Sequence, residues 1–204
     1  MEEITTVETA NPFDQQADLL KKWLRYLYYV EAIMLVVSVL HSVPRISSLV
    51  TVWLNRILSI LAVVILFHLI PGNSRYRKAA IFGAVGTCGS ILIGIRGSML
   101  ETTAGMLLSV CSLIGTYQEY HAHSELIWEK DEKLSAKWAS LFTWEFLIGM
   151  AVSLLSTSAV LAVASMEIAS ELLVSAVLIV LIVPEVIIKL LYLKYLKIML
   201  SMLE

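Results

Sequence analysis

Residues 117–137 read YQEYHAHSELIWEKDEKLSAK, and they form the only long polar stretch between residue 30 and the C-terminal end of the sequence. Four long apolar runs precede this stretch and two follow it. A run of about 20 apolar residues is long enough to cross the hydrocarbon core of a bilayer as a helix. The sequence therefore predicts an all-α, polytopic membrane protein with a bundle of six transmembrane helices.

The composition favours the same fold class. Hydrophobic residues make up 58% of the 204 residues and charged residues make up 16%, and the mean hydropathy is +0.81. These values lie outside the range of soluble globular domains. The net charge of -2 provides no excess of positive charge for nucleic acid. We therefore expect the lipid bilayer as a partner and exclude nucleic acid.

The apolar runs divide the chain into a short tail and one membrane domain. Residues 1–11 are expected to form a flexible polar tail, and they lack the basic segment and apolar core of a cleaved signal peptide. An interfacial helix is expected to start near Pro12, because Asn11 suits a helix N-cap and proline suits the first helical position. A short cytoplasmic helix is expected between the fourth and fifth spans. Within the single domain of residues 12–204, the six spans are expected at 24–43, 49–70, 79–97, 99–117, 138–165 and 168–193.

Basic residues are distributed unequally between the two sides of these spans. Of the 15 Lys and Arg residues, all except Arg45, Arg56 and Arg96 fall on the side that holds both chain ends. Cytoplasmic loops of membrane proteins carry the excess of Lys and Arg. We therefore predict that both termini and residues 117–137 are cytoplasmic. The sequence has no Asn-x-Ser/Thr acceptor, which is compatible with the bacterial cytoplasmic membrane that we expect as its location.

Charged side chains within the spans are candidates for a functional site, because they are costly in lipid and usually face a bundle interior. Glu31, Glu145 and Glu185 lie a short way inside the predicted cytoplasmic boundary, and His68 lies at a comparable depth. With Lys189, they are expected to line a polar cavity in which carboxylates bind a cation or a proton. Alternatively, Glu185 and Lys189 neutralise each other along one helix, and the other two glutamates reach toward the headgroups.

A run of possible metal ligands lies within the polar stretch. Glu119, His121, His123 and Glu125 are residue types that bind zinc or iron. On a helix, His121 and His123 point in nearly opposite directions, so the run offers two separate pairs, Glu119 with His123 and His121 with Glu125. A metal site would need further ligands, such as His68. The alternative is a solvated helix that extends from the fourth span.

Small residues recur along the third predicted span at Gly83, Gly86, Ser90 and Gly94. Small side chains at such spacing let the backbones of transmembrane helices approach closely. We expect this face to pack inside the bundle. A contact in a homo-oligomer and a flexible helix that lines a pore are the alternatives.

No motif of a recognised catalytic class is present, and the sequence predicts no particular cofactor. The leading hypothesis is a transport or permeation unit, or the membrane subunit of one, with an acidic cavity facing the cytoplasm. The alternative is a membrane scaffold or regulatory subunit that docks a cytoplasmic protein through residues 117–137. A third hypothesis is a membrane-embedded metalloenzyme that uses His68, His121 and His123.

Overall fold

The computed structural model describes residues 12–41, 48–93, 99–165 and 171–203, and this part of the chain contains six helices and no strand. The prediction of an all-α fold is therefore confirmed. The expected tail, residues 1–11, lies outside the described residues. The helices are α1 (Pro12–His41), α2 (Ser48–His68), α3 (Arg75–Ile93), α4 (Met99–Ile127), α5 (Glu132–Ser165) and α6 (Glu171–Met202).

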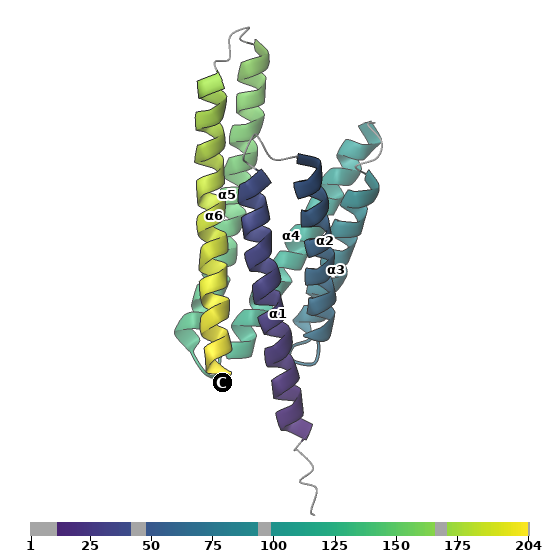
Figure 1. The fold of residues 1–204 in the computed structure, drawn as a ribbon, viewed down its shortest axis with the longest axis vertical. Coiled ribbons are helices and arrows are strands. Elements are labelled where there is room, and N and C mark those ends of the chain that lie inside the picture. Colours follow the sequence, from purple (N-terminus) through teal and green to yellow (C-terminus); the bar gives the residue numbers. More distant parts are fainter. Residues whose placement is uncertain (1–11, 42–47, 94–98, 166–170, 204) are drawn as a thin grey trace, which may run out of the picture.

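The six helices form a closed ring. Each helix packs against the next one in the sequence, and α6 packs against α1. The helices run alternately up and down the long axis of the molecule (Figure 1). The start of α1, the α2–α3 turn, the α4–α5 turn and the end of α6 therefore lie at one end of the ring. We call this the basic end, because it carries Lys21, Lys22, Arg25, Arg75, Arg77, Lys78, Lys130, Lys133, Lys137, Lys194 and Lys197.

The two short helices that we expected outside the spans do not exist as separate elements. Helix α1 is continuous from the expected interfacial segment into the first span, and α4 and α5 extend to meet at the turn of residues 128–131. No Pro or Gly interrupts residues 13–41 or 117–127. Helix propagation depends on local hydrogen bonds, so a change from polar to apolar surroundings does not by itself end a helix. At the turn, Asp131 Oδ1 accepts a hydrogen bond from the Leu134 amide at 2.9 Å and caps the start of α5.

Two helices are long and apolar enough to cross a membrane. They are the segments Gln16–His41 in α1 and Leu49–His68 in α2, and no other helix in the described ranges meets the same length and hydropathy criteria. The six spans are therefore not confirmed. In α3, three basic residues fall within a helix of only 19 residues, and α4 is rich in Ser, Thr and Gly, which lowers the mean hydropathy of both.

Glycine allows close packing between α3 and α4. A Cβ atom added at Gly86 would lie 2.0 Å from Ser112 Oγ, and one at Gly115 would lie 3.0 Å from the backbone nitrogen of Gly83. At Gly83 itself, an added Cβ would lie 3.3 Å from a methyl group of Val63 in α2. These glycines therefore let α3 approach both neighbouring helices. The other two expected packing positions, 90 and 94, lie outside the part of the chain whose packing is described.

Candidate functional site

A cluster of ionisable side chains lies inside the ring, close to the basic end. It contains three carboxylates, one ammonium group, one imidazole and three phenol groups, and these come from every helix except α2. We call it the polar cluster. Its members are Glu31, Tyr76, Glu119, Tyr120, His123, Glu145, Lys189 and Tyr192.

His123 is fully buried and connects three helices. Its Nδ1 atom lies 2.7 Å from the Tyr76 hydroxyl, and its Nε2 atom lies 3.3 Å from the Tyr192 hydroxyl. The Tyr192 hydroxyl donates a hydrogen bond to Glu119 Oε1 at 2.5 Å, so its oxygen is free to accept a hydrogen bond from Nε2. This assigns the ring proton to Nε2 in the neutral imidazole, with Tyr76 donating to Nδ1.

Glu119 lies one helical turn before His123, and its Oε1 atom is 3.6 Å from His123 Nε2. Burial raises the pKa of Glu119, but the His123 ring, the Tyr192 hydroxyl and the Lys189 ammonium outweigh burial and hold the pKa below its usual value. Burial also raises the pKa of the Tyr76 phenol, in this case well above the usual range. Glu119 is therefore ionised and accepts hydrogen bonds, and Tyr76 is a neutral phenol at rest.

The remaining carboxylates of the polar cluster each have one partner. Tyr120 donates a hydrogen bond to Glu145. Glu31 is buried, and its carboxylate lies 3.4 Å from the Lys189 ammonium. That ammonium also lies 5.5 Å from the centre of the Tyr192 ring, within the range of a cation–π contact. Three carboxylates thus lie within the electrostatic reach of one lysine.

A cavity of about 180 Å³ lies beside Lys189, on the side away from His123. Asn55 contributes a side-chain oxygen that is buried and has no hydrogen-bond partner among the residues that the structure describes. An acceptor of this kind is a site for an ordered water molecule. The other residues that line the cavity are Met34, Leu35, Ser38, Glu185 and Val186.

The structure brings together three of the five residues that we expected around a polar cavity. Glu31, Glu145 and Lys189 belong to the polar cluster, and Glu185 lines the adjacent cavity. His68 lies apart from them. Its ring stacks on Trp23 with 3.9 Å between the ring centres, beside an apolar groove of about 670 Å³ between α1 and the α2–α3 turn.

The four residues considered as metal ligands separate onto two faces of α4. Glu119 and His123 face the polar cluster, whereas Glu125 accepts hydrogen bonds from Arg75 at 2.6 Å and from Asn73 at 3.0 Å near the surface. The ring of His121 packs on Tyr117, with 4.1 Å between the ring centres. Within the described ranges, no three His, Cys, Asp or Glu side chains are arranged to hold a metal ion.

Sequence reasoning missed the three tyrosines of the polar cluster. A signal was present on α6, where positions 185, 189 and 192 follow helical spacing and share one face. Buried tyrosines also usually need a hydrogen-bond partner for their hydroxyl groups. The chain has no significant match among protein-family models, curated proteins or solved structures.

Proposed function

We propose that this protein is a six-span membrane protein that moves a proton or another small cation across the bilayer, with the polar cluster as its binding site. The observation that carries the proposal is the excess of carboxylates over ammonium groups in the buried cluster. Negative charge inside a bundle is costly unless a proton or a cation neutralises it. The cluster therefore favours uptake of a positively charged species.

The outer surface of the ring supports insertion in a membrane. Large apolar side chains are exposed along several helices, for example Leu49 (67% exposed) in α2, Met106 (66%) in α4 and Trp144 (58%) in α5. A soluble monomer rarely exposes so much contiguous apolar surface. Helices α1 and α2 are apolar enough to cross the bilayer alone. The polar groups of α4, α5 and α6 in the cluster point into the ring, where they avoid lipid.

The basic end supports an orientation. An excess of Lys and Arg is typical of the cytoplasmic side, so we place both termini and the α4–α5 turn in the cytoplasm, most simply in a bacterial cytoplasmic membrane. The polar cluster lies near this end of the ring. In this orientation, cytoplasmic cations reach the cluster first.

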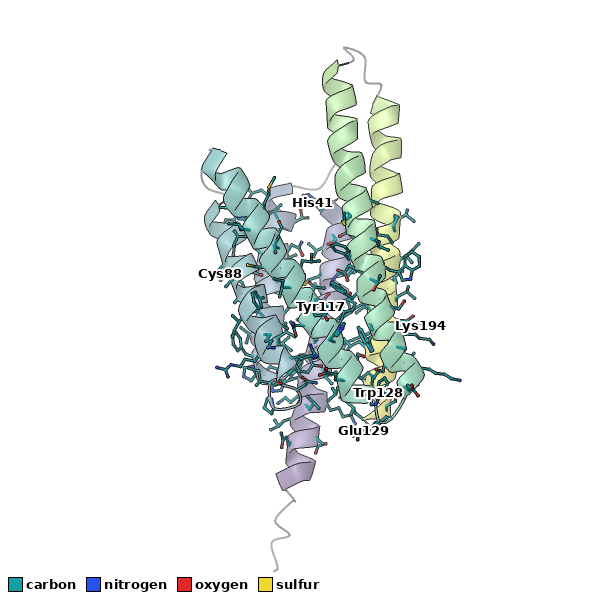
Figure 2. The ribbon with its side chains drawn as sticks, turned by 180° about the vertical axis from the view of Figure 1, so that it is seen from behind. His41, Cys88, Tyr117, Trp128, Glu129 and Lys194 are labelled. Atoms are coloured by element: carbon teal, nitrogen blue, oxygen red, sulfur yellow. The ribbon has the colours of Figure 1, made fainter. Side chains whose placement is uncertain are left out.

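The placement of residues 117–137 argues against a pure docking role. Tyr120, His123 and Leu134 of this segment are buried, whereas Trp128 and Glu129, labelled at the turn in Figure 2, are among its exposed residues. Most of the inner face of this segment is used to build the polar cluster.

Flux measurements in proteoliposomes test the proposal. Purified protein should carry protons, Na⁺ or K⁺ down an imposed gradient, read by an indicator dye trapped inside the vesicles. We expect Glu31→Gln, Glu119→Gln and Glu145→Gln each to reduce the rate by about tenfold or more. Glu129→Gln, on the exposed turn, is the matched control and should leave the rate unchanged. The proposal would be rejected if the protein gave no flux above that of empty vesicles. It would also be rejected if all three variants carried cations as fast as the parent protein.

A further inference from the structure

The interior of the ring is closed between the basic end and the carboxylates of Glu31 and Glu145. Side chains with no measurable exposure fill this layer. We call it the closed layer. It is formed by Leu24, Leu27, Tyr76, His123, Trp138 and Leu196.

A metal cation cannot cross the closed layer without a large rearrangement. Cations such as Na⁺, Mg²⁺ or Ca²⁺ need several oxygen ligands at every position, and the closed layer supplies mainly leucine side chains and aromatic rings. The described side chains also contain no group of three or more ligands that could hold a metal. A proton has no such requirement, because it moves along hydrogen bonds between groups that stay in place.

A continuous chain of hydrogen-bonding groups begins at Tyr76 within the closed layer and ends at Glu119. It runs from the Tyr76 hydroxyl to His123 Nδ1 (2.7 Å), from Nε2 to the Tyr192 hydroxyl (3.3 Å), and from this hydroxyl to Glu119 Oε1 (2.5 Å). Its members come from α3, α4 and α6. Histidine suits the central position, because it can gain a proton at one ring nitrogen and release one from the other.

We propose that the transported cation is a proton, and that it crosses the closed layer through Tyr76, His123, Tyr192 and Glu119. This inference rests on the proposed function and names its substrate. A hydronium ion from the basic end gives a proton to the Tyr76 oxygen when water transiently reaches this buried side chain, as the hydroxyl proton passes to His123 Nδ1 and makes an imidazolium. Nε2 then gives its proton to the Tyr192 oxygen as the Tyr192 proton passes to Glu119. Each oxygen of a tyrosine loses one proton and gains one, and no electrons are transferred.

The charges that face Glu119 explain how the proton leaves it. Burial raises the pKa of Glu119, but His123, then the Tyr192 hydroxyl and the Lys189 ammonium, outweigh burial and lower it, so the carboxylic acid readily gives up its proton. Glu145 with Tyr120 and Glu31 with Lys189 are the other charged partners in reach. Beyond Lys189, the cavity lined by Glu185 and Asn55 offers space for water. After the transfer, His123 carries its proton on Nδ1 and must return it to Nε2 before the next cycle.

Removal of one hydroxyl group tests the chain. Tyr192→Phe keeps the ring that packs on Trp138 (ring centres 5.2 Å apart) but removes the link between His123 and Glu119. Tyr195→Phe, on the same helix and also in contact with Trp138 (5.8 Å), is the matched control. In proteoliposomes, we expect Tyr192→Phe to lower the proton flux by about tenfold or more and Tyr195→Phe to leave it unchanged. Flux through the parent protein should also be slower in D₂O.

Tyr76→Phe breaks the chain at its other end and carries the test if Tyr192→Phe does not fold. Proton flux that both variants leave intact would overturn the inference. Selective flux of Na⁺ or K⁺ that Glu145→Gln reduces would also overturn it, but it would support the proposed function. Absence of flux for every cation would overturn both.

Discussion

The Lys189 ammonium lies 3.4 Å from the Glu31 carboxylate and thereby joins the last helix of the chain to the first, across a separation of 158 residues. The pair lies where α6 packs against α1 and closes the ring. Glu31 is buried, whereas about a third of the Lys189 side chain is exposed, toward the cavity that it lines. The glutamate therefore depends on the lysine more than the lysine depends on the glutamate.

Loss of the lysine should destabilise the bundle. Lys189→Met keeps the length of the side chain but leaves the buried Glu31 without its cation. We expect a loss of about 2 kcal/mol, less than for a fully buried pair because Lys189 is partly exposed. Thermal unfolding in detergent would measure it. The double variant Glu31→Gln, Lys189→Met should recover part of the loss, and a single variant as stable as the parent would contradict the pair's role.

Contact between α3 and α4 should not tolerate a methyl group at Gly86. A Cβ atom there would lie 2.0 Å from Ser112 Oγ and 3.3 Å from the Ser112 Cα atom, so the two helices must separate. Gly86→Ala is expected to cost about 1–3 kcal/mol of stability. Gly105→Ala is the control, because an added Cβ at Gly105 meets nothing within 4 Å. Equal unfolding temperatures for the two variants would show that α3 and α4 are packed less closely at Gly86 than in this structure.

Labelling of cysteines in intact cells should establish the orientation. In a background of Cys88→Ser and Cys111→Ser, a cysteine placed at the exposed position of Trp128 should react only with a reagent that crosses membranes. Ser47→Cys, which lies in the sequence between the first two expected spans, is the control and should react with an impermeant reagent from outside. Reaction of Trp128→Cys with the impermeant reagent would reverse the proposed topology and remove the cytoplasmic entry to the polar cluster.

The surface pair of Arg75 and Glu125 should make stability depend on pH at acidic values. Burial raises the pKa of Glu125, but hydrogen bonds from Asn73 and Arg75 outweigh it and lower the pKa from its ordinary value of 4.5. A carboxylate whose pKa is lowered by folding stabilises the fold at pH values above its ordinary pKa. This contribution is lost as the pH falls through the pKa of the folded state. Both side chains are substantially exposed, so Arg75→Gln should cost less than about 1 kcal/mol at neutral pH.

The stability difference between the parent and Arg75→Gln should therefore shrink as the pH falls below 4.5. Unfolding temperatures in detergent across this range would measure it. Arg77→Gln is a suitable control, since Arg77 is exposed and no ion pair of its side chain is found among the described residues. A difference that stays constant with pH would mean that Arg75 acts through packing alone.

The sequence was sufficient to predict the helices and the basic end of the ring. Proline at 12 and the Pro71–Gly72 turn signal act on the local backbone, and the apolar runs between them depend only on hydrophobic spacing. Because short connections make successive helices run in opposite directions, the basic segments all come to one end of the ring. The expectation of a separate interfacial helix and a separate cytoplasmic helix was wrong, because nothing in the local sequence of α1 or α4 stops helix propagation where the surroundings change from polar to apolar.

The partners of the polar groups were decided only by the tertiary structure. The i, i+4 spacing showed that Glu119 and His123 share a face, but it could not show that this face meets Tyr76 of α3 and Tyr192 of α6. Likewise, spacing along α6 suggested Glu185 as the partner of Lys189, and the folded ring instead places Glu31 of α1 within 3.4 Å. Such contacts depend on how each helix is rotated about its axis, and this rotation is set by the packing of all six helices together.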